Sequence, residues 1–370
     1  MSRFKWIALS LRSGATIVVL LTLASCTSIS VDEISSSKPV EHGTVAGAQN
    51  NNVVWPAPPE KARYRLSAVL IGEQTVSGGE SNKGFLTNFA EVITGLAIGE
   101  RKYKELLRPA SGLTLENGSV LVVDAGLKAL VQFDFSKKSF KIWDQSGSNR
   151  GFKTPIAVVE DGEGGFLVSD SELGKVVRLG KDGQPRGEFG ASDLTRPTGL
   201  ARDPASGAIF VADSAKHVVK KFSSSGQLMA TIGGPGQEVG RFNAPTYLSF
   251  ANGRLFVSDT LNFRVQSFDS NGTSPKSFGK AGLYVGQFTR PKGVAVGGEG
   301  RIYVVESRQD HLLVFDPEGQ LLLPIEGRAE FGSFYLPAGV WTDGKHKVYI
   351  ADMFNGRVVV LEELTKLSEG

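Results

Sequence analysis

The sequence contains few of the residues that form covalent or metal cross-links. Its 370 residues include one cysteine, four histidines and three methionines. Because Cys26 has no second cysteine to pair with, an intramolecular disulfide, redox chemistry and zinc–thiolate chemistry are excluded from the folded part. Lys and Arg total 41 against 38 Asp and Glu, and the formal net charge of +3 is too small to indicate nucleic acid or a membrane surface by itself.

Several enzyme motifs are also missing. The sequence has no Gly-x-Ser-x-Gly turn, no phosphate-binding glycine loop and no Cys-x-x-Cys-His. Glycine runs such as Gly233–Gly236 keep the register of the repeat described below, so we interpret them as turns between strands. No reaction class is indicated by a local motif.

The N-terminal segment has the pattern of an export signal. Arg3, Lys5 and Arg12 precede or begin an apolar stretch, Ala15–Ala24, that is too short to span a membrane comfortably. The segment ends in Leu-Ala-Ser-Cys, which resembles a bacterial lipobox with Cys26 as the lipidated residue. We therefore predict a signal peptide over 1–25 and attachment to the membrane through a lipid on Cys26.

The resemblance to bacterial lipoproteins also implies a location. Thr27 follows the cysteine and carries no acidic side chain, which implies the outer membrane in cells with two membranes, facing the periplasm or the exterior. Residues 26–60 are rich in Ser, Asn, Gly, Pro and Val without periodicity, and we predict a flexible tether. The expected localisation is the cell envelope.

A repeat of about 46 residues runs through the rest of the chain. Each unit has a proline, a short apolar strand, a turn and a second apolar strand that ends in an acid. The repeated residues are Pro109, Pro155, Pro197, Pro245, Pro291 and Pro337, and Asp124, Asp170, Asp213, Asp259, Glu306 and Asp352. Repeats of 40 to 50 residues with several strands per unit are typical of β-propeller blades, so we predict an all-β six-bladed propeller over 61–370.

The two ends of the repeat region complement each other. The last unit stops after its third strand, Arg357–Leu361, and a lone strand precedes the first unit. We predict that residues 62–72 form the outer strand of the sixth blade and close the ring.

An insertion over 73–106 interrupts the spacing. Phe85, Phe89, Val92 and Leu96 fall on one face at helical spacing, which predicts a short amphipathic helix. The helix would pack over one end of the ring or serve as a docking element for a partner.

The units resemble NHL repeats from Arg108 to Leu361. Gly240–Pro245 followed by Leu255–Asp269 is close to the family consensus, with Asp259, Asn262 and Arg264 in its Asp-x-x-Asn-x-Arg signature. The first two units lack the Asn and the Arg, so those blades should be looser or braced differently.

In the resembling family, the loops before the prolines and the loops with the Asp-x-x-Asn-x-Arg signature lie on one face of the disc. The residues that this resemblance places there include Arg108, Arg196, Arg290, Arg264, Arg308, Arg357, His217 and His311. A basic axial face is therefore expected, able to take an acidic ligand or an acidic envelope protein. For Arg264 and Arg357, pairing with the acid of the same blade is the favoured alternative.

Two classes of function follow. We favour a binding or scaffolding protein without catalysis, without a cofactor and without a nucleic-acid partner. The alternative is a metal-dependent lyase or hydrolase with an axial site that resembles amidating lyases or gluconolactonases, with zinc or calcium bound at the axis. His217 and His311 are the only histidine pair available for such a site, and zinc sites need three protein ligands.

Overall fold

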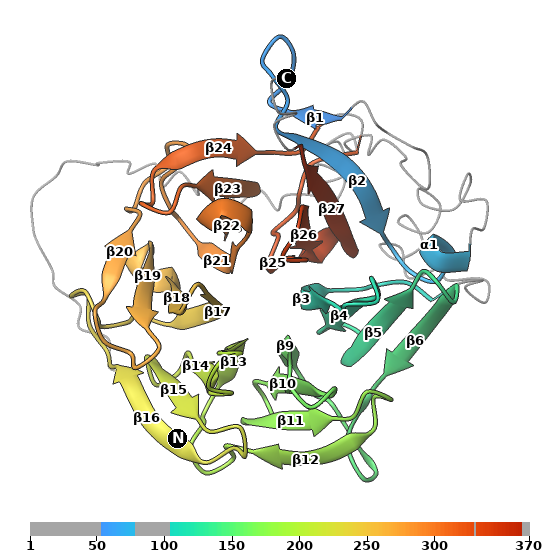
Figure 1. Cartoon of the computed structure of the whole chain (residues 1–370), viewed down its shortest axis with the longest axis vertical. Helices are drawn as coiled ribbons and strands as arrows, with labels where there is room; N and C mark the ends of the chain where they lie inside the picture. The colour runs from blue at the N-terminus through green and yellow to red at the C-terminus, as the bar shows by residue number, and fades with distance from the viewer. Residues whose placement is uncertain (1–52, 78–103, 329–330, 365–370) are drawn as a thin grey trace, which may run out of the picture. The chain divides into compact units, whose positions relative to one another are not determined.

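The computed structural model describes residues 53–77, 104–328 and 331–364. The predicted signal peptide, Cys26, most of the tether and the insertion from Phe85 to Leu96 lie outside the described residues. Within those three ranges, no helix has the length and apolar character needed to cross a membrane. Six antiparallel sheets surround a common axis as the blades of a propeller, which confirms the predicted fold (Figure 1).

Five blades have four strands that follow one another in sequence from the axis outwards. Blade 1 holds β3 (Pro109–Thr114), β4 (Val120–Asp124), β5 (Ala129–Asp134) and β6 (Ser139–Trp143). Blade 2 holds β9 (Pro155–Glu160), β10 (Phe166–Asp170), β11 (Lys175–Leu179) and β12 (Pro185–Phe189). Blade 3 holds β13 (Pro197–Arg202), β14 (Ile209–Asp213), β15 (Val218–Phe222) and β16 (Leu228–Gly233).

Blade 4 holds β17 (Pro245–Ala251), β18 (Arg254–Asp259), β19 (Arg264–Asp269) and β20 (Lys276–Phe278). Blade 5 holds β21 (Pro291–Val296), β22 (Ile302–Glu306), β23 (His311–Phe315) and β24 (Leu321–Ile325). Blade 6 holds β25 (Val340–Thr342), β26 (Lys347–Asp352), β27 (Arg357–Glu363), β2 (Tyr64–Leu70) and β1 (Val54–Trp55). The remaining elements are the hairpin β7 (Gln145–Gly147) and β8 (Arg150–Gly151), helix α1 (Gln74–Ser77), and the 3-10 turns η2 (Thr260–Asn262), η3 (Gly298–Gly300) and η4 (Met353–Asn355).

The core lies between neighbouring blades. The second strands β4, β10, β14 and β22 are buried at every position, because each sheet is covered on both faces by the blades beside it. Their near-continuous runs of Val, Ile, Leu and Phe follow from this double burial. Each such side chain contributes roughly 1.5–3 kcal/mol when it is fully buried.

The N-terminal strand closes the ring, as predicted. Strand β2 pairs antiparallel with β27, from Tyr64 opposite Glu363 to Leu70 opposite Val358. Strand β1 adds a fifth strand, and Trp55 donates its indole N–H to the backbone oxygen of Glu326 at 3.0 Å. Because Trp55 is buried on blade 6, the folded domain begins before residue 61 and includes the end of the predicted tether.

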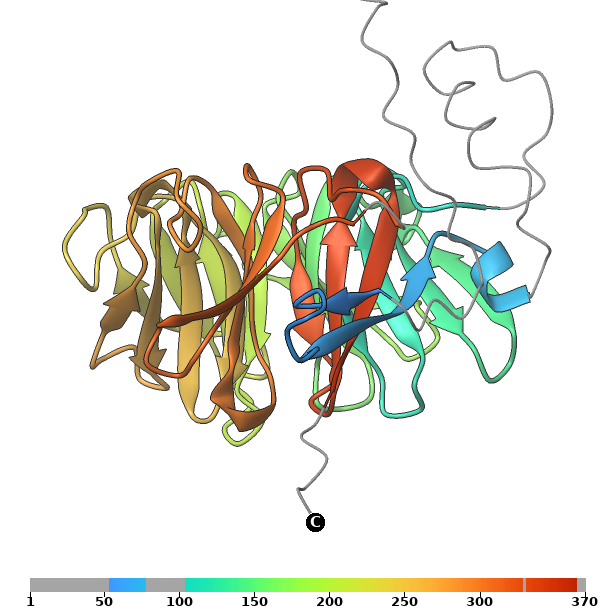
Figure 2. The same cartoon turned by 90° about the horizontal axis from the view of Figure 1, so that it is seen from above.

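The six first strands start on one face of the disc and end on the other (Figure 2). We call the face with the connections before the prolines and the loops after the acids the proline face. The end formed by the loops between the first and second strands of each blade is called the opposite face. These two faces are the candidate sites.

Candidate functional site

The repeated acid holds the loops of the proline face. All six acids are fully buried, and a buried carboxylate needs hydrogen-bond donors. In blade 1, Asp124 accepts hydrogen bonds from four backbone N–H groups, those of Leu107, Arg108, Gly126 and Leu127. Asp170 is bonded in the same way by four N–H groups in blade 2. The blades without the Asn and the Arg are thus braced by backbone donors.

In blades 4 and 6 the acid accepts one backbone N–H, from Asn243 or Tyr335, and its other donors are side chains. Arg264 donates from Nε to Asp259 at 2.8 Å, and its other nitrogens donate to the backbone oxygens of Gln237, Glu238 and Arg241. Arg357 donates to Asp352 at 2.7 Å and to two backbone oxygens, and only 8% of it is exposed. Both arginines are engaged in holding loops, which fits the structural alternative for these two residues.

His217 links two blades. The residue four positions after each acid has a positive φ, and His217 occupies this position in blade 3 with φ 56°. Its Nδ1 accepts the backbone N–H of Ala244 at 3.0 Å, just before Pro245 of blade 4. Asp310 does the same from blade 5, where it accepts the N–H of Leu336 at 2.7 Å. His217 therefore has a structural role at the junction of blades 3 and 4.

His311 lies in a different environment. It begins β23 in blade 5, and its Nε2 is 3.4 Å from the carboxylate of Glu326. The two histidines thus belong to different blades and contact different partners. Within the ranges that the structure describes, no three His, Cys, Asp or Glu side chains are grouped so that they could hold a metal ion.

The other four predicted arginines are exposed on the proline face. Arg108, Arg196, Arg290 and Arg308 form no ion pair with another described residue. The guanidinium of Arg108 lies 5.5 Å from the centre of the Phe354 ring, a cation–π distance. These cations are available to a partner.

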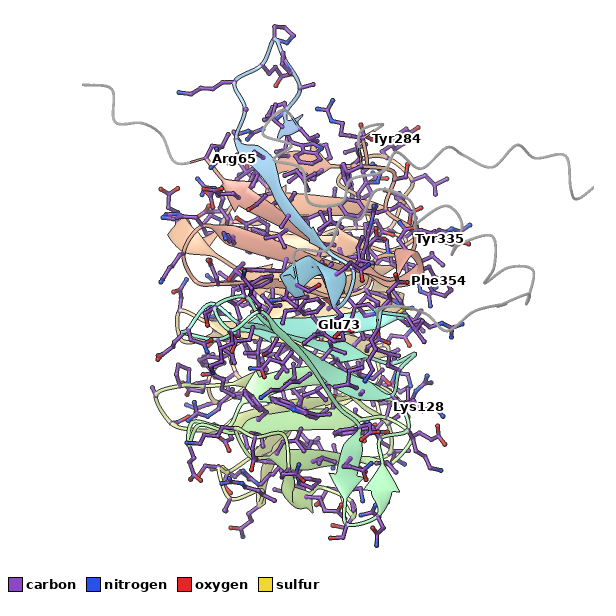
Figure 3. All side chains as sticks on the ribbon, turned by 90° about the vertical axis from the view of Figure 1, so that its right-hand side faces the viewer. Arg65, Glu73, Lys128, Tyr284, Tyr335 and Phe354 are labelled. Carbon is purple, nitrogen blue, oxygen red and sulfur yellow. The ribbon has the colours of Figure 1, made fainter. Side chains whose placement is uncertain are left out.

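Exposed apolar side chains, which we call the apolar patch, lie in the same set of loops as the arginines. Of the twelve large apolar side chains exposed in the described ranges, eight lie in loops of the proline face, namely Leu107, Val239, Leu261, Leu283, Tyr284, Val285, Tyr335 and Phe354. Tyr284 is 80% exposed, and Tyr335 packs edge-to-face on Phe354 at 5.6 Å. Figure 3 shows Tyr284, Tyr335, Phe354 and Lys128 projecting from the same side of the disc.

Tyr247 crosses the axis. It belongs to β17 of blade 4, and its hydroxyl donates to the backbone oxygen of Ala110 in β3 of blade 1 at 3.1 Å. Blades 1 and 4 face each other across a ring of six, so the phenol spans the channel. Removal from water raises the pKa of Tyr247, and the hydroxyl stays protonated as a donor at neutral pH.

Lys292 is the residue after the proline on β21 of blade 5. Burial and the charge of Arg290 lower the pKa of Lys292 to about 8. Its ammonium is therefore fully charged only below that pH. In the other five blades the corresponding residues are uncharged: Ala110, Ile156, Thr198, Thr246 and Ala338.

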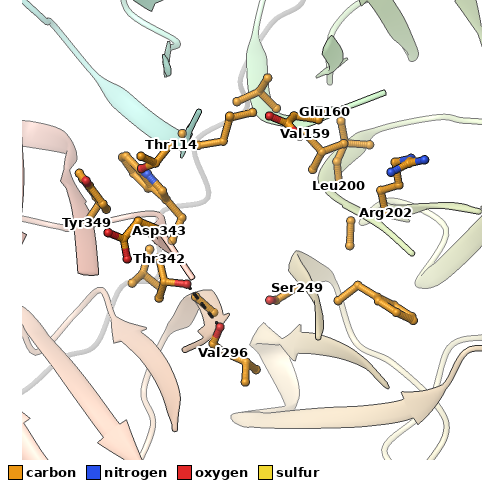
Figure 4. A pocket seen from close by; sticks show the side chains of 18 of the residues that line it. Thr114, Val159, Glu160, Leu200, Arg202, Ser249, Val296, Thr342, Asp343 and Tyr349 are labelled. Atoms are coloured by element: carbon orange, nitrogen blue, oxygen red, sulfur yellow. Dashed lines mark hydrogen bonds between the residues drawn. The ribbon is translucent and has the colours of Figure 1, made fainter. Parts of the chain in front are cut away.

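A cavity of about 870 Å³ opens on the opposite face. The first strands of all six blades line it (Figure 4). In each blade the lining begins three positions after the proline, at Gly112, Val158, Leu200, Leu248, Val294 and Val340. None of its lining residues comes from the connections before the prolines. The indole of Trp341 fills the space over Gly112, because a Cβ there would lie 2.7 Å from the Trp341 ring.

The fold and these two faces define a six-bladed propeller with a partly closed axis and a ligand-sized cavity. Virginiamycin B lyase from Staphylococcus aureus has a similar structure, with a TM-score of 0.51 and 14% identity over 71% of this chain and 85% of that one. A gluconolactonase from Xanthomonas campestris gives a TM-score of 0.54 and 15% identity over 70% of this chain and 87% of that chain.

An auxiliary nutrient binding protein from Bacteroides thetaiotaomicron gives a TM-score of 0.55 and 12% identity over 70% and 69% of the two chains. No protein-family model matches this chain, and no curated protein is similar to it in sequence. At these identities the likeness concerns the fold. Membership of the NHL family stays a prediction.

The sequence reasoning missed both the apolar patch and the cavity. The patch comes from single residues at the tips of loops in different repeats, which share no period. The sequence did contain a signal for the cavity. The residues five positions after the prolines form its rim, and two of them, Glu160 and Arg202, are charged.

Proposed function

We propose that this chain is an exported, lipid-anchored binding or scaffolding protein of the bacterial cell envelope, and that its proline face contacts an acidic protein. The observation that carries the proposal is the combination on one face of exposed arginines with most of the exposed large apolar side chains. Apolar patches rimmed by polar groups mark interaction sites. Tyr, Phe and Arg are also the residues enriched at the centres of protein interfaces.

The partly closed axis on this side favours a broad contact over an axial active site. Tyr247 spans the channel below the proline face, and His217, Arg264 and Arg357 are engaged in loop hydrogen bonds. The neighbours in fold include an enzyme and a nutrient-binding protein, so the fold itself is compatible with either class. The alternative, a metal-dependent lyase or hydrolase, is tested by elemental analysis of domain purified without chelators, where stoichiometric zinc or calcium would favour it.

The lipid anchor is tested separately. Replacing Cys26 by Ser should leave the propeller folded but move the protein from the membrane fraction to the soluble fraction, because the substitution removes the only thiol that can carry the lipid. Fractionation followed by immunoblotting measures the distribution. Retention of the Cys26→Ser protein in the membrane fraction would contradict the anchor and leave the proline-face proposal intact.

The partner surface is tested by removing charge. Changing Arg108, Arg196 and Arg290 together to Gln should reduce capture of an envelope partner at least tenfold and shift the midpoint of thermal unfolding little, since exposed side chains without ion pairs contribute within about 0.5 kcal/mol each.

Capture by the unaltered protein should also weaken as pH rises through about 8, because Lys292 loses its charge there.

A matched control changes three exposed lysines away from the proline face, Lys138, Lys181 and Lys276, to Gln. This control variant loses the same amount of positive charge and should still capture the envelope partner. Equal loss of capture in both triple variants would show a non-specific charge effect and contradict the proposal. A large fall in the unfolding midpoint of the arginine variant would instead place Arg108, Arg196 and Arg290 in the fold.

A further inference from the structure

The rim of the cavity on the opposite face is chemically divided. The residues five positions after the prolines are Thr114, Glu160, Arg202, Phe250, Val296 and Thr342. Blades 2 and 3 thus present a carboxylate and a guanidinium, whereas blades 4 and 5 present an aromatic ring and an aliphatic side chain. Below this rim the cavity wall is almost entirely apolar. Such a cavity suits a molecule with one charged end and an apolar body.

Thr114 Oγ1, Trp341 Nε1 and Arg202 Nε are the buried polar atoms of the described lining that have no partner, and of these three residues only Arg202 is charged. Its side chain forms no ion pair or hydrogen bond with another described residue, and its Nε is buried. Buried hydrogen-bond donors in folded proteins are normally paired. An unpaired donor at the wall of a cavity therefore indicates that a bound ligand supplies the acceptor. The guanidinium provides parallel donors whose geometry matches a carboxylate.

A neighbouring loop contacts Arg202. Its guanidinium packs against Gly162 of blade 2, where an added Cβ would meet Nη2 at 2.1 Å. Gly162 has φ +86°, which favours glycine, and the loop and the arginine therefore fit together only with this residue. This contact limits the positions open to the guanidinium on the side of blade 2, which lowers the entropic cost of binding.

Glu160, the acid at the rim beside blade 3, repels an anionic ligand less than a glutamate with an ordinary pKa does. Burial, followed by the charge of Glu116, raises the pKa of Glu160, and the charge of Arg202 opposes this rise. The other charged residues at the mouth are Asp343, Lys345 and Lys347, so the three acids and three bases of the lining cancel. The selection of a ligand thus depends on where each charge lies and not on the net charge.

The apolar half offers flat surfaces. Trp341 stacks on Tyr349 with ring centres 5.3 Å apart and planes 8° from parallel, and Phe250 stacks on Phe210 at 5.6 Å and 11°. Trp341, Tyr349 and Phe250 line the cavity. We infer that this cavity binds a small organic carboxylate, with its carboxylate on Arg202 and its apolar body against Phe250, Val296 and Trp341. This inference does not rest on the proposed partner of the proline face.

The test uses three carboxylates, benzoate, 1-naphthaleneacetate and dodecanoate, each with its uncharged amide. Isothermal titration calorimetry on the full chain should detect at least one of the acids with a dissociation constant below about 1 mM, and its amide should bind at least tenfold more weakly. An amide that binds as tightly as its acid, or no binding of any acid at that concentration, would overturn the inference.

Two variants locate the site. Arg202→Gln should weaken binding of the acid at least tenfold and leave binding of its amide unchanged. A change in the shape of the cavity alone would weaken binding of both. Ser249→Phe, in which Ser249 lines the cavity (Figure 4), should weaken both because it fills the cavity without changing charge. Arg196→Gln on the proline face is the matched control and should bind like the unaltered protein. Acid binding that persists in both cavity variants, or that is lost in the control, would overturn the assignment.

Discussion

Replacing residues 53–71 by a Gly/Ser linker of equal length is expected to abolish cooperative thermal unfolding of the propeller. The replaced segment contains Val53, Trp55, Tyr64, Leu66 and Leu70, which are 2–4% exposed. Burial of five such side chains contributes roughly 8–15 kcal/mol, comparable to the roughly 5–15 kcal/mol that stabilises a typical protein. The replacement also leaves β27 as an open sheet edge, which promotes aggregation.

Circular dichroism and calorimetry measure this effect, and two comparisons sharpen it. The same replacement of β12, the outer strand of blade 2, should cost far less, because most of its residues are exposed and it closes no ring. A synthetic peptide of residues 53–72 added to the linker variant should restore the transition. A linker variant with an unaltered unfolding midpoint would show that the ring does not depend on this strand.

Arg357→Leu is expected to cost about 3–5 kcal/mol of unfolding free energy, because it leaves the carboxylate of Asp352 buried without its cation. The backbone oxygens of Phe331 and Ser333 lose a donor in the same step. Burial already raises the pKa of Asp352, and Arg357 opposes that rise. Chemical denaturation of the variant and the unaltered protein measures the difference.

The pH dependence gives a second measurement of the same variant. Without Arg357, the folded-state pKa of Asp352 should rise further above its unfolded value, so the loss of stability grows as pH rises from the unfolded-state pKa towards the folded-state pKa and is complete above the latter. The deficit should therefore be smaller near pH 5 than near pH 8. Arg196→Leu, which removes an exposed arginine without an ion pair, is the control and should change stability by less than about 0.5 kcal/mol. A deficit as small for Arg357→Leu would contradict the structural role of this arginine.

The architecture could be predicted because two residue types repeat for physical reasons. In five of the six blades the proline begins the inner strand. In all six blades the acid ends the second strand, where its carboxylate holds the loops of the proline face. The missing strand of blade 6 and the extra strand before blade 1 could be matched by counting alone. Such features depend on local sequence and length.

The sites depend on contacts that no period encodes. Tyr247 interrupts a position that is Gly in blades 3, 5 and 6, and its reach to Ala110 can be seen only once blades 1 and 4 face each other. The link from His217 to Ala244 likewise joins residues 27 positions apart across a blade boundary. The sequence reasoning considered His217 for a metal because residue type was its only information about that loop.

Tyr247 narrows the channel through the disc between the cavity and the proline face. The cavity opens on the opposite face, so a protein docked on the proline face would leave its mouth uncovered. If both proposals hold, one molecule could hold a protein partner and carry a small solute at the same time. Tyr247 would then lie between the two binding sites.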